Sequence, residues 1–85
     1  MFYVYIIKFL RNWKLYIGRT SDLKRRLKEH VENQSKSTKN KGPFVLIYYE
    51  AYRSQRDAYI RERKLKKFKN SYAELKKRLK YSIVG

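Results

Sequence analysis

The sequence predicts an α+β fold in which a small three-stranded antiparallel sheet is flanked by three helices, in the order β-β-α-β-α-α. Three stretches rich in β-branched and aromatic residues, at 2–9, 14–19 and 44–52, have the composition of strands. Apolar residues recur at helical spacing between and after them. The 85 residues suit one domain, and aromatic residues, at 16% of the chain, supply large side chains for its core.

The first two strands are expected to form a hairpin. Residues 2–9 carry apolar side chains at both alternating sets of positions, which is typical of a central strand covered on both faces. Residues 10–13 then predict a short turn, and 14–19 return as the second strand. In this hairpin we expect Phe9 to pair with Lys14.

That register brings two tyrosines together. It places Tyr5 opposite Gly18 and Ile7 opposite Tyr16, so both phenols project from one face as diagonal neighbours. Tyrosines in strands are more often plain core residues. A glycine within a strand, however, often lets another backbone or a ligand approach closely, which favours a functional role for this pair.

A helix is predicted from Asp22 to about Glu32. Asp22 is of the type that caps helix N-termini. The apolar positions follow at helical spacing, at Leu23, Leu27 and Val31. Arg26 and His30, one turn apart, lie near the edge of this stripe and are expected to point inward or along the sheet margin. The outward positions are Arg25, Lys28 and Glu29.

The segment from Asn33 to Pro43 is polar and ends in Gly-Pro, which predicts a loop. Its lysines, Lys36, Lys39 and Lys41, suit contact with a phosphate backbone. Such a stretch is equally often a solvated connector, and the sequence leaves both interpretations open.

A second helix is predicted from Ser54 to about Phe68, opened by a sequence that resembles a capping box. Its inward positions are Ala58, Leu65 and Phe68, and Glu62 falls among them. A carboxylate among apolar neighbours is costly unless it is paired, so Glu62 should have a cation, either a metal ion or an arginine. The plainer alternative is a salt bridge, for instance to Arg26 or to Lys66.

A further capping box at Ser71 predicts the start of a third helix. Its inward side chains are expected to be Tyr72, Leu75 and Leu79. The opposite face is a basic surface formed by Lys76, Lys77, Arg78 and Lys80.

The charge of the chain indicates its class of partner. Lys and Arg number 23 against 7 Asp and Glu, a formal net charge of +16, which favours a nucleic acid over a membrane or an acidic protein. The chain has no cysteine, which excludes a disulfide framework or a thiolate zinc site, and its single histidine excludes a multi-histidine metal site. No apolar run approaches the ~20 residues of a membrane span. We expect a soluble cytoplasmic protein, with a monomer as the default.

Five motifs, taken in order, resemble the GIY-YIG endonuclease domain, and in particular its small stand-alone bacterial members and the N-terminal domain of excision-repair nucleases. The motifs are Tyr3–Tyr5, Leu15–Thr20, Asp22–His30, Tyr48–Glu50 and Ala58–Glu62. A single Tyr-Ile-Gly triplet is weak evidence, whereas the series in this order is specific. The resemblance implies one nuclease domain over residues 1–85 and a three-stranded antiparallel sheet with flanking helices.

The same resemblance implies roles for five residues. Tyr5 and Tyr16 match the phenols that hold or deprotonate the attacking water. Arg26 matches the arginine that holds the scissile phosphate, and His30 falls where relatives assist proton transfer. Glu62 matches the carboxylate that binds one divalent ion, Mg²⁺ or Mn²⁺.

The function implied is a metal-dependent endonuclease that hydrolyses DNA, with RNA left open, at damaged, branched or single-stranded sites. Arg19, where some repair relatives have lysine, is expected to touch phosphate. The alternative is a basic nucleic-acid-binding module without catalysis. A third possibility, a ribosome-associated basic protein, explains the charge but gives no purpose to an inward Glu62.

Overall fold

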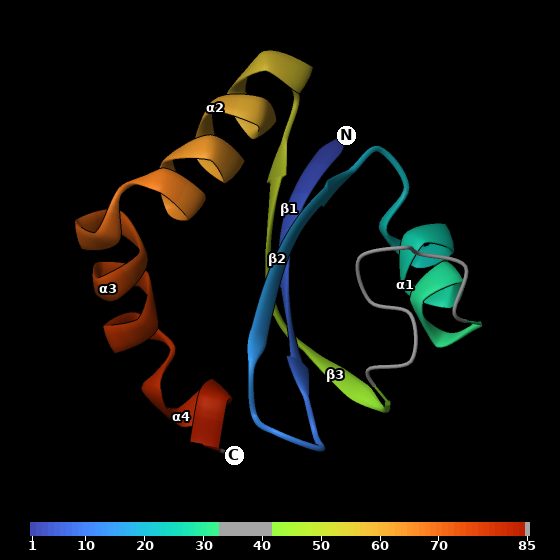
Figure 1. The fold of residues 1–85 in the computed structure, drawn as a ribbon. Coiled ribbons are helices and arrows are strands. Elements are labelled where there is room, and N and C mark those ends of the chain that lie inside the picture. The colour runs from blue at the N-terminus through green and yellow to red at the C-terminus, as the bar shows by residue number, and fades with distance from the viewer. Residues whose placement is uncertain (33–41, 85) are drawn as a thin grey trace.

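The computed structural model describes residues 1–32 and 42–84. Its elements are β1 (Phe2–Phe9), β2 (Leu15–Thr20), α1 (Leu23–Val31), β3 (Phe44–Tyr52), α2 (Gln55–Lys67), α3 (Lys69–Arg78) and α4 (Lys80–Val84) (Figure 1). The predicted order of strands and helices is confirmed as far as α3. The short α4 is an addition that the sequence analysis did not predict.

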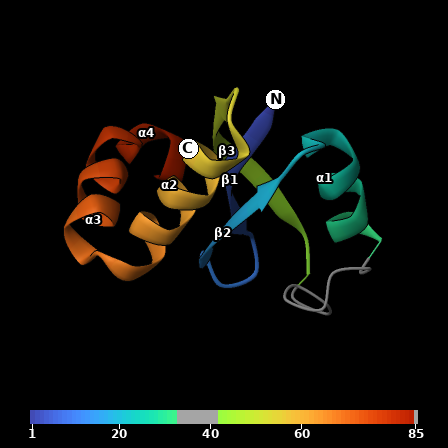
Figure 2. The ribbon, with the colours of Figure 1, turned by 90° about the horizontal axis from the view of Figure 1, so that it is seen from above.

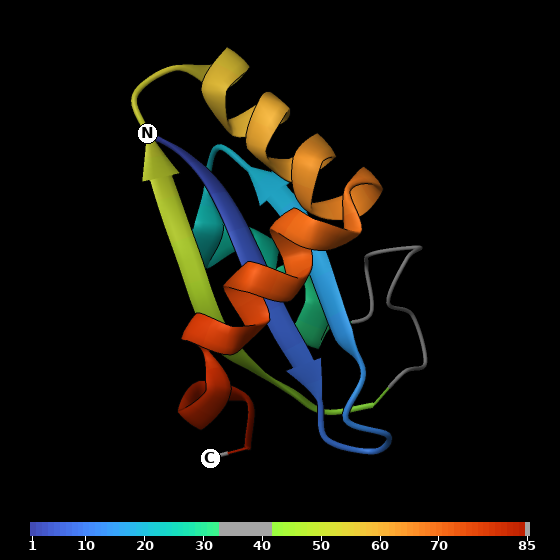
Figure 3. The ribbon, with the colours of Figure 1, turned by 90° about the vertical axis from the view of Figure 1, so that its left-hand side faces the viewer.

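β1 lies in the middle of the sheet, whose strand order is β2-β1-β3 with both pairings antiparallel (Figure 3). The apolar residues on both faces of β1 predicted that it would be the central strand. The hairpin register is also as predicted, since Tyr5 pairs with Gly18. The turn is closed by a hydrogen bond of 2.9 Å from the Phe9 amide to the Lys14 carbonyl.

The sheet lies between two helical layers, with α1 on one face and α2, α3 and α4 on the other (Figure 2). Alternate side chains of β1 fill two separate cores. One lies under α1 and contains Tyr5, Ile7 and Phe9, with Leu23 and Leu27 packed against it. The other lies under α2 and α3 and contains Val4, Ile6, Ile17, Ala58, Leu65 and Leu75, with Tyr72 and Leu79 packed against it. The inward positions predicted for the third helix are thereby confirmed.

The start of α1 is confirmed and its last inward residue is corrected. The Asp22 side chain accepts a hydrogen bond of 3.1 Å from the Arg25 amide, as expected of an N-cap. Val31, predicted to face inward, is 69% exposed. The inward position of the last turn belongs to His30 instead, and Val31 is rotated by about 100° from it around the helix axis.

The junction between α2 and α3 also differs from the prediction. Phe68 has an extended backbone, ends α2 and immediately precedes α3, so its side chain leaves the apolar stripe and is 59% exposed. α3 begins at Lys69, which places Ser71 inside its first turn and makes the predicted capping box at Ser71 wrong. Ser54 is the N-cap of α2 as expected, although its side chain makes no capping hydrogen bond.

Candidate active site

A hydrogen bond between the side chains of Tyr5 and His30 connects β1 to α1. The Tyr5 hydroxyl lies 2.8 Å from Nε2 of His30. Tyr5 is fully buried and His30 is 3% exposed, so neither group depends on bulk water for this partner. The inward direction predicted for His30 is confirmed.

Tyr16, on β2, brings a second phenol to the same place. Its ring centroid lies 5.5 Å from that of His30 and 6.4 Å from that of Tyr5. Phe44 approaches the His30 ring from β3, at 5.9 Å. The imidazole is therefore surrounded by aromatic rings, and of the two phenols only Tyr16 is partly exposed.

Gly18 makes room for Tyr5. A Cβ atom at Gly18 would lie 2.3 Å from both Cζ and the hydroxyl oxygen of Tyr5, far inside van der Waals contact. β2 is an edge strand, so the missing side chain lets the Tyr5 ring lie across it toward the margin of the sheet. The group that approaches Gly18 is thus the Tyr5 side chain, whereas the sequence analysis expected another backbone or a ligand there.

Arg26 lies at the edge of the apolar stripe of α1, as predicted, and its side chain is 29% exposed. Its Nη1 donates a hydrogen bond of 3.1 Å to Oε1 of Glu29, three residues along the helix. It also lies close enough to the Tyr5 phenol to lower the pKa of that group, against the effect of burial. Glu29 was predicted to point away from this region, which is wrong, because its carboxylate turns back along the helix to the guanidinium.

The electrostatics of the site keep both members of the Tyr5–His30 pair neutral. Burial raises the pKa of Tyr5 to about 12, the nearby Arg26 guanidinium opposes this rise, and the charges of Tyr16 and Glu62 add to it. Burial and the charge of Arg26 lower the pKa of His30, with Glu29 acting in the opposite direction. At neutral pH the phenol therefore carries its proton and the imidazole is neutral, and a hydrogen bond from the Tyr5 hydroxyl to Nε2 requires the tautomer with its proton on Nδ1.

Glu62, on α2, has the cation that the sequence predicted, and it is an arginine. Its Oε1 accepts a hydrogen bond of 3.2 Å from Nε of Arg19, and its Oε2 accepts one of 3.3 Å from Nζ of Lys66. The Lys66 pair was foreseen as one alternative, whereas Arg19 takes the place suggested for Arg26. Arg19 reaches Glu62 because it lies on β2 beside Gly18 and faces the opposite side of the sheet, where α2 packs.

The other predicted phosphate contacts, Lys36, Lys39 and Lys41, lie outside the described residues. Arg19 is described, and its guanidinium Cζ lies 5.1 Å from the centre of the Tyr59 ring, in a cation–π contact.

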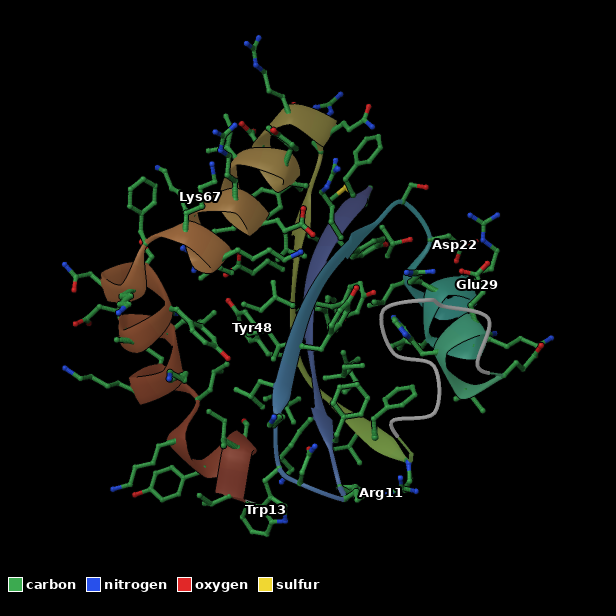
Figure 4. The ribbon with its side chains drawn as sticks, viewed as in Figure 1. Arg11, Trp13, Asp22, Glu29, Tyr48 and Lys67 are labelled. Carbon is green, nitrogen blue, oxygen red and sulfur yellow. The ribbon has the colours of Figure 1, made fainter. Side chains whose placement is uncertain are left out.

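A second polar cluster, centred on Glu50 of β3, was not predicted. Its carboxylate accepts hydrogen bonds from Arg61 Nε at 2.9 Å and Arg61 Nη2 at 3.1 Å, and from the hydroxyls of Tyr48 and Tyr52. Figure 4 shows Tyr48 between the sheet and the helices α2 and α3. The signal was present in the sequence, because Tyr48, Glu50 and Tyr52 alternate along one strand and share a face.

Comparison with known proteins identifies the family. The model of the GIY-YIG catalytic domain matches residues 1–80. The chain belongs to the GIY-YIG family. A UPF0213 protein of Clostridium perfringens is 40% identical over 68 residues, covering 79% of this chain and 72% of that protein. A UPF0213 protein of Staphylococcus haemolyticus is 39% identical over 67 residues, covering 78% and 80%.

The fold is shared with a solved member of this group. The solution NMR structure of a UPF0213 protein from Bacillus halodurans superimposes with a TM-score of 0.58 at 31% sequence identity, and the match covers 99% of this chain and 94% of that one. The α+β architecture predicted from the sequence is therefore confirmed as the GIY-YIG type.

Membership of the GIY-YIG family places the chain among nucleases and implies binding of a nucleic-acid substrate. GIY-YIG nucleases generally depend on a divalent metal ion. Within residues 1–32 and 42–84, no three His, Asp or Glu side chains cluster as a ready-made metal site. The single carboxylate that the resemblance implies as a metal ligand is that of Glu62. One carboxylate fits Mg²⁺, which keeps several waters and takes its remaining ligands from substrate phosphate. No helix in the described part of the chain is long and apolar enough to cross a membrane.

Proposed function

We propose that residues 1–85 form one nuclease domain, a metal-dependent endonuclease that hydrolyses DNA phosphodiester bonds in the repair or processing of damaged, branched or single-stranded DNA. The observation that carries the proposal is the hydrogen bond between Tyr5 and His30, with Tyr16 and Arg26 beside it and Glu62 close enough to raise the pKa of the Tyr5 phenol. Tyr5, Tyr16, His30 and Arg26 supply groups that move protons and bind phosphate on the α1 side of the sheet, and Glu62, on the α2 side, is the group proposed to hold a metal ion.

The attacking water meets Tyr16 first. Tyr5 and His30 are buried, whereas Tyr16 is the phenol that is partly open to solvent. A phenol whose pKa is raised to about 12, as burial does for Tyr5, is a poor base by itself. Neutral His30 is the better proton acceptor, so Tyr5 would pass its hydroxyl proton to Nε2 of His30 and regain one from the water through Tyr16.

Two cations are proposed to stabilise the negative charge that develops on the phosphate in the transition state. Arg26 is partly exposed at the sheet margin and offers a planar guanidinium to the scissile phosphate. Glu62 would hold the divalent ion, which would supply positive charge to stabilise the attacked phosphate and the leaving oxygen. Removal of either cation should slow the chemical step.

The test is cleavage of supercoiled plasmid and of branched DNA by the purified protein, with Mg²⁺, with Mn²⁺ and with chelator. We expect nicking that requires the metal and that Glu62→Gln reduces by about 10²-fold or more. Glu74→Gln is the matched control, because Glu74 is a 74% exposed glutamate on α3. Cutting that survives Glu62→Gln would rule out the metal role. Tight, salt-sensitive binding without cutting of any substrate would favour the non-catalytic binding module.

A further inference from the structure

Both oxygens of the Glu62 carboxylate already have a cationic partner. Oε1 accepts from Arg19 at 3.2 Å and Oε2 accepts from Lys66 at 3.3 Å. The Glu62 side chain is 17% exposed, so water screens these pairs less than it screens a surface pair. Each contact occupies one lone pair of its oxygen and places a positive charge beside the position that a metal ion would take.

A metal ion and Arg19 compete for this carboxylate. Mg²⁺ binds carboxylate oxygen at about 2.0–2.1 Å, which would place two positive charges next to a guanidinium nitrogen that bonds the same oxygen. Like charges at that separation repel strongly where the carboxylate is mostly buried. Binding of the ion therefore weakens the contact between Arg19 and Glu62.

Arg19 can move to another partner. Its backbone is fixed in β2 by pairing with Val4, but its side chain is 33% exposed and lies over the open face of Tyr59. A guanidinium binds phosphate oxygens in a bidentate way, so a nucleic-acid strand offers a replacement for the lost carboxylate. Lys66 is 50% exposed and its side chain is flexible, so its ammonium group can move away from Glu62 into solvent when the ion binds.

We propose that Arg19 is a positioning residue that exchanges Glu62 for a substrate phosphate, so that the metal ion and the nucleic acid bind cooperatively. The inference rests on the metal role of Glu62 in the proposed function. Because linkage is reciprocal, the nucleic acid strengthens metal binding by the same factor as the metal strengthens nucleic-acid binding. The contact thus keeps metal affinity low until a phosphate strand is present.

The first measurement is Mn²⁺ binding to the protein alone, by electron paramagnetic resonance. Arg19→Met should tighten Mn²⁺ binding by about two- to fivefold, the range that one partly exposed ion pair supports. Arg63→Met is the matched control, since it removes the same charge from the adjacent helix but its guanidinium contacts the Tyr59 hydroxyl, at 3.3 Å. The control should change the affinity by less than half as much. An equal gain in both variants would reduce the effect to net charge and overturn the exchange.

The second measurement repeats the titration with a cleavage-resistant phosphorothioate oligonucleotide. The oligonucleotide should tighten Mn²⁺ binding to the parent protein, and Arg19→Met should lose most of that gain. If Mn²⁺ binding depends on Glu62 but Arg19→Met behaves as the parent does, the exchange is wrong and the proposed function stands. If Glu62→Gln binds Mn²⁺ as well as the parent does with the oligonucleotide present, the metal site itself is wrong and both fall.

Discussion

The phenol ring of Tyr5 lies across Gly18 of the neighbouring strand, where a Cβ atom would come within 2.3 Å of the ring and its hydroxyl. The Tyr5 hydroxyl forms a hydrogen bond of 2.8 Å with Nε2 of His30, on α1. A glycine in β2 and a histidine in α1 thus place one buried phenol between them. The position of Tyr5 depends on both.

Gly18→Ala should displace Tyr5 and destabilise the fold. The new methyl group collides with ring atoms that are packed in the core, and overpacking of this kind costs about 1–3 kcal/mol. Urea denaturation of the single variant measures the cost. The same change in a Tyr5→Leu background, which lacks the colliding atoms, should cost less than half as much. Equal costs in the two backgrounds would contradict the contact.

Stability should fall below about pH 6.5 because His30 is buried in its neutral form. Burial and the charge of Arg26 hold the folded-state pKa of His30 below its ordinary value of 6.5. As pH decreases through that value the unfolded chain takes up a proton first, so the free energy of unfolding falls by up to about 1.4 kcal/mol per pH unit. The stability that neutral His30 contributes is therefore fully present above pH 6.5, and it is lost as the pH falls from 6.5 toward the folded-state pKa.

Urea denaturation between about pH 7.5 and 5.5 should show this slope in the parent protein and little of it in His30→Gln. Since His30 is the single histidine, its ring can also be titrated directly by NMR without any substitution. A folded-state pKa above 6.5 would contradict the prediction.

Arg61→Met should destabilise the chain by about 1–3 kcal/mol, because it leaves the Glu50 carboxylate, 15% exposed, without its bidentate partner. Arg56→Met, at an exposed arginine on the same helix, should stay within about 0.5 kcal/mol. Burial raises the pKa of Glu50, but its bonds to Arg61 and two tyrosines outweigh this and hold the pKa below 4.5. The stabilisation is therefore present above pH 4.5, and the cost of Arg61→Met should shrink below it. A cost independent of pH would argue against this pair.

Local sequence patterns predicted most of the fold. The two-sided apolar pattern of residues 2–9 identified the central strand, and the turn length set Tyr5 opposite Gly18. These features depend on neighbours in sequence. Phe68 could not be predicted in the same way, because its apolar side chain fits the stripe of α2 while its extended backbone ends that helix.

The directions of most candidate side chains could be predicted from helix phase and register, but the pairing of Glu62 could not. Helix phase indicated that Glu62 needs a cation, yet which arginine supplies it depends on how α2 packs over β2, and that brings Arg19 rather than Arg26. The cluster at Glu50 was hidden for a related reason. Alternation along β3 places Tyr48, Glu50 and Tyr52 on one face, but Arg61 reaches that face only because α2 packs against the sheet.

The two phenols should respond differently to loss of the hydroxyl. Tyr5→Phe removes a buried hydrogen bond to His30 and should cost about 1–2 kcal/mol of stability. Tyr16→Phe keeps the aromatic ring that packs edge-on against the imidazole, so its effect on stability should be smaller. Tyr16 is also the phenol that is partly exposed, so its hydroxyl is the one proposed to meet the water.

Tyr16→Phe should therefore slow cutting on the order of 10²-fold while stability changes little. Single-turnover cleavage with saturating protein measures the rate, and urea denaturation of the same sample measures the stability. His30→Ala should also slow cutting, because the phenols then have no imidazole to accept the proton of the water. If His30→Ala loses the rate and Tyr16→Phe keeps it, the imidazole acts on the water without the outer phenol, and the relay through Tyr16 is wrong.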